Sequence, residues 1–413
     1  MAEHLARPVR RAVVIGGSMS GLFAALYLRR QGWQADVYER SPVALIGRGA
    51  GIMTHPEMHR ALIGLGLDPT RDFGIPVERR LVLDRAGDVI CERRYPQVAT
   101  SWNRLFDMLH AALGAGRYHL GKDLRHVSQT ADAVTAHFAD GTTHSADLLI
   151  GADGFRSTVR ALLLPEAHPL YAGYVGWRGL ADEAVLAGIL APEVFASLAF
   201  VLPPGEQFLG YPVAGPGNDL RPGRRSWNIV WYRPADEATE MPRLLTDETG
   251  HRHEMSIPPP LVARVVVAEM RDAAARLLPS QMLAAVDRIN QPFLQPIYDL
   301  ESDRMAFGRV ALMGDAAFVV RPHVGAGIVK AVEDAAMLAE TLSQGSDVQA
   351  ALLAYEAERV SAGRKYVAQA RLLGSYLRHL FDTDAERALA ARYADPVRVL
   401  AETAALDFLR TPG

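Results

Sequence analysis

The stretch Gly314-Asp315-Ala316-Ala317, followed by Pro322 and by Gly325-Ala326-Gly327, decides the predicted fold of this chain. It comes directly after the apolar run 309–313, which is typical of a buried strand. An acid at the carboxyl end of such a strand lies where ligands bind in open α/β sheets. The glycines precede a helical stretch, whose first turn offers free N–H groups to an anion. The pattern predicts a ligand-binding loop late in the chain.

A second glycine-rich loop, Gly16-Gly17-Ser18-Met19-Ser20-Gly21, lies near the N-terminus. It joins the β-branched run 12–15 to a predicted helix over 20–31, which is the arrangement that cradles a pyrophosphate. Glu39 ends the next predicted strand, about where an acid accepts hydrogen bonds from ribose hydroxyls. For Arg40 the alternatives that stay open are a contact with adenine, a contact with phosphate, and a solvated side chain. Two such loops at opposite ends of the chain favour FAD over NAD.

A third motif, Gly151-Ala152-Asp153-Gly154, follows the apolar run 147–150 and precedes a predicted helix. Asp153 is expected to fix this loop by accepting hydrogen bonds from backbone N–H groups. For Arg156 and Arg160 two interpretations stay open, phosphate contacts and solvated charges on a helix. The three motifs together predict a cofactor that extends across the whole fold.

The fold class predicted is α/β, a Rossmann-like FAD-binding domain with an inserted antiparallel, β-rich substrate domain and a helical C-terminal tail. The segments expected in the FAD-binding domain are 1–75, 100–172 and 285–343. The β-rich domain is expected over 76–99 and 173–284, where aromatic residues and prolines are dense. Residues 344–413 are expected to be helical.

Composition narrows the function further. The chain has 413 residues, a net charge of −3 and a single cysteine, Cys91. We therefore expect no nucleic-acid partner, no intrachain disulfide and a cytoplasmic location. No apolar run reaches the roughly 20 residues of a membrane-spanning helix.

Taken together, the motifs resemble the class A flavoprotein aromatic hydroxylases, the p-hydroxybenzoate hydroxylase-like family, to about residue 375. The stretches 16–22, 171–179 and Asp303-Arg304-Met305, with Arg321-Pro322-His323, look especially like its dihydroxypyridine branch. The resemblance implies non-covalent FAD, with NADH or NADPH as a transient reductant and O2 as oxidant. It implies hydroxylation of a hydroxypyridine-like ring through a C4a-hydroperoxyflavin. The residues expected to contact the cofactors are Gly16, Gly17, Ser18, Met19, Ser20, Gly21, Glu39, Arg40, Arg48, Asp153, Gly154, Asp315, Gly325, Ala326 and Gly327.

The residues expected at the substrate are His323, Pro322 and Tyr211. His323 is a candidate acceptor for the proton of a substrate hydroxyl, or a satisfied loop histidine. Tyr211 is a substrate-facing tyrosine by resemblance, or a core aromatic. Trp177 and Arg178 are interpreted as sheet residues and not as ligands.

Three alternatives stay open. One is a phenolic or polyketide-like ring as substrate, another is a different flavin oxidoreductase, and the third is a non-catalytic nucleotide-binding protein. Three positions depart from the family pattern, since Phe318, Trp102 and Val329 stand where histidine, arginine and asparagine are common. Leucines at helical spacing in the tail, such as Leu373 and Leu377, suit packing on a second subunit of a homodimer or on the chain's own α/β domain.

Overall fold

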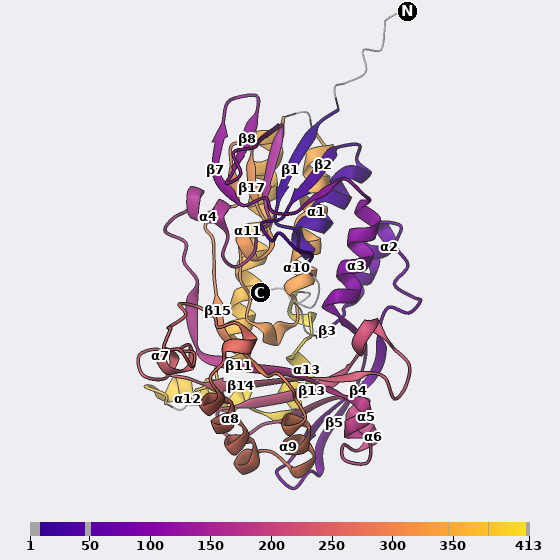
Figure 1. Cartoon of the computed structure of the whole chain (residues 1–413), viewed down its shortest axis with the longest axis vertical. Helices are drawn as coiled ribbons and strands as arrows, with labels where there is room; N and C mark the ends of the chain where they lie inside the picture. Colours follow the sequence, from indigo (N-terminus) through magenta and orange to yellow (C-terminus); the bar gives the residue numbers. More distant parts are fainter. Residues whose placement is uncertain (1–8, 46–50, 346, 379, 410–413) are drawn as a thin grey trace, which may run out of the picture.

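The computed structural model of the chain describes residues 9–45, 51–345, 347–378 and 380–409. One half of the molecule, which the sequence predicts to be the nucleotide-binding half, is built on a six-stranded sheet with the order β16-β17-β10-β1-β2-β6 (Figure 1). All pairs are parallel except β16–β17. The strands are β1 (Arg11–Ile15), β2 (Gln34–Tyr38), β6 (Tyr118–His119), β10 (Leu148–Gly151), β16 (Ala306–Phe307) and β17 (Val310–Leu312). The central strands β1 and β10 are almost wholly buried, as their apolar sequences predict.

Helices and a small sheet cover the nucleotide-binding sheet. Helix α1 packs on both α3 and α10, and α10 packs on α11. These helices are α1 (Met19–Arg30), α3 (Trp102–Leu113), α10 (Gly327–Ser343) and α11 (Val348–Leu373), and shorter ones are α2 (Pro56–Gly64) and α4 (Thr158–Leu163). The small sheet has the order β7-β8-β9, with strands β7 (Leu124–Gln129), β8 (Val134–Phe138) and β9 (Thr143–Ala146). Strand β1, helix α1 and strand β2 form the β–α–β unit that the sequence predicts near the N-terminus.

The second half is an eight-stranded sheet with the order β15-β11-β14-β13-β12-β4-β5-β3. Its strands are β3 (Gly51–Met53), β4 (Ile75–Leu83), β5 (Val89–Ser101), β11 (Leu170–Asp182), β12 (Leu198–Val201), β13 (Gln207–Val213), β14 (Ser226–Pro234) and β15 (Phe293–Asp299). The sheet is antiparallel as predicted, except that β12 runs parallel to β4. No tight turn links β4 to β12, so their relative direction is not set by a hairpin. The sheet also includes β3 and β15, which lie within the segments 1–75 and 285–343 that were predicted for the FAD-binding domain.

The two faces of the large sheet have different neighbours because side chains alternate along a strand. Trp177, Trp227 and Trp231 belong to a core on one face, under helices α8 (Arg264–Leu277) and α9 (Ser280–Asp287). Tyr211 and Tyr232 lie on the other face and join the core of the nucleotide-binding half. Short helices at the edges are α5 (Glu183–Leu186), α6 (Pro192–Phe195) and α7 (Glu240–Leu244). The second face therefore lies between the two halves of the molecule.

The C-terminal segment is helical, as predicted, and returns to the large sheet through α12 (Asp384–Tyr393) and α13 (Pro396–Glu402) (Figure 1). Arg80 of β4 is completely buried and holds the end of this segment. Its guanidinium donates to the carbonyl oxygens of Leu400, Thr403 and Ala404 at 2.8, 2.6 and 2.9 Å. A buried cation thus fixes the carboxyl end of α13, where the helix dipole is negative.

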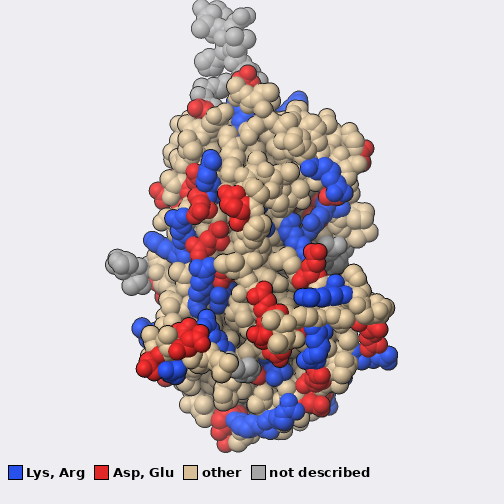
Figure 2. Space-filling view, turned by 90° about the vertical axis from the view of Figure 1, so that its left-hand side faces the viewer, with Lys and Arg blue, Asp and Glu red and all other residues tan. Residues whose placement is uncertain are grey.

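On the face shown in Figure 2, acidic and basic side chains are interspersed. Among the described helices, none combines the length and the apolar character that crossing a bilayer requires.

A buried ion pair joins α10 and α11 to the loop that carries Asp315. Asp334 accepts hydrogen bonds from the N–H of Gly314 at 2.9 Å and from Nε of Arg359 at 2.6 Å. Arg359 also donates to Glu333 at 3.1 Å, and both Asp334 and Arg359 are buried. Removing one member would leave a buried charge without its partner, which is costly.

Asp334→Ala should therefore lower the free energy of unfolding by about 3 kcal/mol, since it strips Arg359 and the Gly314 N–H of an acceptor. Urea unfolding measures this loss. The matched control is Arg364→Ala, which removes the exposed Arg364–Asp303 pair and should cost less than about 1 kcal/mol. Equal losses in the two variants would contradict the buried role of Asp334.

Candidate functional site

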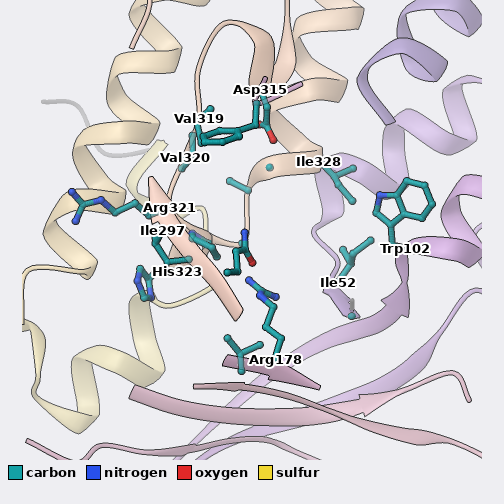
Figure 3. A pocket seen from close by; sticks show the side chains of 18 of the residues that line it. Ile52, Trp102, Arg178, Ile297, Asp315, Val319, Val320, Arg321, His323 and Ile328 are labelled. Atoms are coloured by element: carbon teal, nitrogen blue, oxygen red, sulfur yellow. The ribbon is translucent and has the colours of Figure 1, made fainter. Parts of the chain in front are cut away.

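A cavity of about 720 Å³ lies between the two halves of the molecule (Figure 3). A smaller cavity of about 250 Å³ extends from it along the glycine-rich turn after β1. Ser18, Trp102, Ala152 and Gly154 line both cavities, so the two meet there. An elongated ligand with a polar and an apolar end fits this shape better than a compact one.

The first glycine motif forms the floor of the smaller cavity. Gly16 has a φ of 107°, and a Cβ on it would overlap the carbonyl oxygen of Ala152. Gly21 lies inside α1 and packs against the carbonyl of Gly16, so its role is local packing. Ser18 is the N-cap of α1 and makes no side-chain capping bond. Its hydroxyl and the first N–H groups of α1 are thus available to an anionic ligand.

Glu39 lies at the far end of the smaller cavity and holds the turn. Its carboxylate accepts a hydrogen bond from the N–H of Gly17 and another from the N–H of Ser41, both at 2.8 Å. Each oxygen keeps a second lone pair, which leaves the predicted contact with a ribose hydroxyl possible. Arg40 lines the same cavity. Arg48, also predicted to contact the cofactor, lies outside the described residues.

The loop after β10 has the hydrogen bonds expected of its aspartate. Asp153 accepts from Oγ of Ser157 at 2.5 Å and from the N–H groups of Thr158 and Val159 at 2.6 and 3.1 Å. Burial still raises the pKa of Asp153, and these bonds oppose that rise. The loop is thereby fixed at the junction of the two cavities.

Both interpretations of Arg160 were wrong. Its guanidinium is buried and donates to the carbonyl oxygens of Phe155 and Ala316 at 2.7 and 3.1 Å. It therefore ties the loop after β10 to the loop after β17, and it is neither a phosphate contact nor a solvated charge. Arg156 is exposed and donates to Oγ of Ser256 at 2.8 Å.

The loop after β17 carries Asp315 at the upper end of the large cavity (Figure 3). The Asp315 carboxylate is about half exposed, and its Oδ1 lies 3.5 Å from Nζ of Lys330. The Lys330 side chain is only 1% exposed, and its Nζ has no hydrogen-bond partner among the described residues. The Lys330 ammonium is the buried counter-ion of the Asp315 carboxylate. Asp315 is thus an anionic acceptor that faces the cavity.

Gly325 is held from both sides. Its φ is 66°, and its carbonyl oxygen accepts from Nε2 of His55 at 3.1 Å. Burial lowers the pKa of His55 to about 4, which keeps this ring neutral. On the other side a Cβ on Gly325 would crowd Ala404. The glycine is therefore required where the C-terminal segment meets the loop, and Thr403 and Ala404 complete the cavity wall.

His323 lines the large cavity but is held by its neighbours. Its Nδ1 lies 3.2 Å from Oε1 of Gln207, and its Nε2 lies 2.8 Å from the hydroxyl of Tyr174. If Nδ1–H donates to the amide oxygen, Nε2 accepts from Tyr174. Burial first, and then the charges of Arg321 and Arg178, lower the pKa of His323 to about 3. Since both ring nitrogens are engaged, neither is free to accept a substrate proton.

The remaining predicted substrate residues also border the large cavity. Pro322 opens the short helical turn Pro322–Val324 and sets the direction of that loop. Tyr211 and Tyr232 line the cavity from β13 and β14, and burial raises the pKa of both phenols. The described part of the chain gives neither hydroxyl a hydrogen-bond partner. Both are available as donors to a ligand.

Sequence reasoning missed two parts of this site. Arg178 lines the cavity, whereas its neighbour Trp177 is a core residue as interpreted. Strand alternation on β11 was a signal that could have separated them. The wall formed by Thr403 and Ala404 had no such signal, because it depends on where the tail docks.

Comparisons with known proteins agree with this geometry. A family model described as "FAD binding domain-like" matches residues 171–299, and one described as "FAD binding domain" matches residues 288–370. The chain is 34% identical to 2,6-dihydroxypyridine 3-monooxygenase of Paenarthrobacter nicotinovorans over 374 residues, which is 89% of this chain and 92% of that enzyme. It is 33% identical to 3-amino-4-hydroxybenzoate 2-monooxygenase of Streptomyces cremeus, over 88% of this chain and 86% of that enzyme.

Solved structures give the same result. The structure of 2,6-dihydroxypyridine-3-hydroxylase from Arthrobacter nicotinovorans superposes with a TM-score of 0.82 at 32% identity, over 92% of this chain and 96% of that one. Klebsiella pneumoniae HpxO complexed with FAD and uric acid superposes with a TM-score of 0.74 at 26% identity, over 95% and 93% of the two chains.

The environment of His323 generates a prediction on pH and stability. The unfolded chain takes up a proton at this histidine near pH 6.5, whereas the folded chain does so only near pH 3. Stability that is present near pH 7 should therefore be lost as the pH falls through this window. In His323→Gln the loss between about pH 7 and about pH 4.5 should be smaller by roughly 2 kcal/mol, measured by urea unfolding.

The matched control for this prediction is His126→Gln, at an exposed position on β7. This variant should lose stability with falling pH as the unmodified chain does. A His323→Gln variant with the same loss as the control would show that His323 titrates normally in the folded protein.

Proposed function

The chain belongs to the class A FAD-dependent aromatic hydroxylases, and from this premise we propose that it uses NAD(P)H and O2 to hydroxylate a hydroxypyridine-like ring. It is a flavin-dependent monooxygenase with FAD as its cofactor. The observation that carries the proposal is the pair of joined cavities. They run from Glu39 past Ser18 and Asp315 to the face of the large sheet that holds Tyr211.

We propose the following placement of FAD. The adenosine lies in the smaller cavity beside Glu39 and Arg40, and the pyrophosphate lies on Gly17, Ser18 and the first N–H groups of α1. The ribityl chain meets Asp315, and the flavin ring lies near the loop Gly325-Ala326-Gly327. Apart from the neighbouring backbone, no atom of the described residues lies within 4 Å of where a Cβ on Gly154 or Gly327 would stand, so a ring can approach the backbone there closely.

Bound FAD, once reduced by NAD(P)H, supplies the activation of O2 and the transfer of one oxygen atom to the ring. The chain's own contribution is to exclude water, which would otherwise divert that oxygen to hydrogen peroxide. The apolar residues that line the cavity from the sheet are Phe200, Leu209, Val230 and Ile297, and Ala404 closes another side. The neutral, fully bonded His323 adds no charge to this wall.

The proposed preference for a dihydroxypyridine is more specific than the general activity of the family. Its support is the similarity to 2,6-dihydroxypyridine 3-monooxygenase over most of both chains. The other relative named above acts on an aminohydroxybenzoate, as its name says, so a substituted phenol is the second candidate. Both are small rings that carry a hydroxyl group.

The proposal predicts that the purified chain binds one FAD, seen as visible flavin absorbance. NADH oxidation should then be accelerated by 2,6-dihydroxypyridine, with labelled oxygen from O2 in the ring product. Hydrogen peroxide should form instead when a ring is not hydroxylated. A chain that takes up no flavin, or that forms no oxygenated product with hydroxypyridines or phenols, would refute the proposal.

A second prediction concerns the cofactor alone. Asp315→Ala should weaken FAD binding by at least about tenfold, since it removes a ribityl acceptor and leaves Lys330 buried without its counter-ion. Fluorescence titration of the apoprotein with FAD measures this. Asp303→Ala, at an exposed carboxylate that lines neither cavity, is the control and should bind FAD normally.

A further inference from the structure

We propose that Arg178 binds the anionic oxygen of a deprotonated ring hydroxyl, so that this enzyme selects aromatic substrates in their oxyanion form. The inference rests on the proposed function and names a substrate class for the same cavity. In this proposal the positive charge of Arg178 activates the substrate hydroxyl, a role for which His323 was the candidate from the sequence.

The position of Arg178 follows from the register of β11. Its paired neighbours are Val230 on β14 and Phe293 on β15, and all three residues line the large cavity. Trp177 and Gly179, on either side of it in the strand, face the helices on the opposite face. Figure 3 shows the Arg178 side chain rising from the sheet into the cavity. The guanidinium is therefore presented to a ligand by a rigid strand.

Charge balance singles out this residue. Three charged side chains line the cavity within the described residues: Arg178, Arg321 and Asp315. Arg321 is paired with Asp299 at 2.8 Å and points away from the cavity in Figure 3. Asp315 is paired with Lys330 at the opposite end. Arg178 has neither a hydrogen bond nor an ion pair to any described residue, and its Nε is buried.

An unpaired, partly buried guanidinium is unfavourable until an anion joins it. Arginine cannot lose its proton at any working pH, so a ligand must supply the missing charge. The groups that face Arg178 do not compete for this role. They are the phenols of Tyr211 and Tyr232 and the neutral ring of His323. The two phenols can instead donate further hydrogen bonds to the same oxyanion.

This arrangement explains how a ring hydroxyl is activated when no base is free. The positive charge lowers the pKa of the ring hydroxyl as the ring enters from solvent, so that its O–H bond breaks and the proton is left in the solvent. The guanidinium stays protonated throughout. The electron pair left on oxygen enriches the ring carbons in the ortho and para positions, which are the ones that accept an electrophilic oxygen atom. Arg178 thus acts as a catalytic residue that touches the substrate.

The test is a pH-dependent binding experiment on the FAD-loaded protein with three ring probes. 2,6-Dihydroxypyridine offers an oxyanion, nicotinate offers only a carboxylate, and pyridine offers neither. The unmodified protein should bind 2,6-dihydroxypyridine as its anion, seen in the ligand's absorption spectrum, with a pKa below that of the free ligand. Arg178→Met should weaken this binding at least about tenfold and return the pKa toward the free value.

Arg178→Lys should keep part of the binding, because it retains charge without the planar fork. Arg94→Met, at an exposed position of β5, is the control and should change nothing. Binding of pyridine should be the same in all variants. If Arg178→Met binds the anion as tightly as the unmodified protein does, the inference is wrong. Nicotinate bound more tightly than 2,6-dihydroxypyridine would also overturn it, in favour of a carboxylate site.

These outcomes are separable from failure of the proposed function. A chain that hydroxylates rings while Arg178→Met binds them normally keeps its function and loses this inference. A chain that forms no oxygenated ring product loses the proposed function, whatever Arg178 binds.

Discussion

The buried contact between Asp334 and the N–H of Gly314 is the constraint on which the site depends. It fixes the start of the loop after β17 against α10, and Arg359 extends the same contact to α11. From this anchored start the loop presents Asp315 on one side, and its Gly325 contacts His55 and Ala404 on the other. Since the pair is buried, its geometry is tightly defined, and so is the direction of the carboxylate that faces the cavity.

The large sheet contributes the second half of the site through its two-residue alternation. One face is closed by helices and aromatic core residues, and the other supplies Arg178, Tyr211 and Tyr232 to the cavity. A strand is a rigid support, so these polar groups are held in place before any ligand arrives. In the proposed function, the glycine-rich loops determine where FAD binds, and the sheet determines which ring binds beside it.

Local sequence patterns predicted the fold class and the cofactor loops because these depend on short-range chemistry. A glycine turn between a strand and a helix and an acid after an apolar strand can both be recognised from a few neighbouring residues. The parallel pairing of β12 with β4 could not be predicted from the sequence, because it joins segments that are far apart in the chain. The environments of His323 and Arg160 were missed for the same reason. Their partners, Gln207, Tyr174 and Ala316, lie on other elements.

The docking of the C-terminal segment on Arg80 has a consequence for how the protein is made. Ala404 supplies a wall of the cavity and donates its N–H to the carbonyl of His323 at 2.7 Å. During synthesis the nucleotide-binding sheet and the large sheet are both complete before this residue leaves the ribosome. A nascent chain therefore keeps an open cavity until Thr403 and Ala404 have been synthesised and have docked against the sheet.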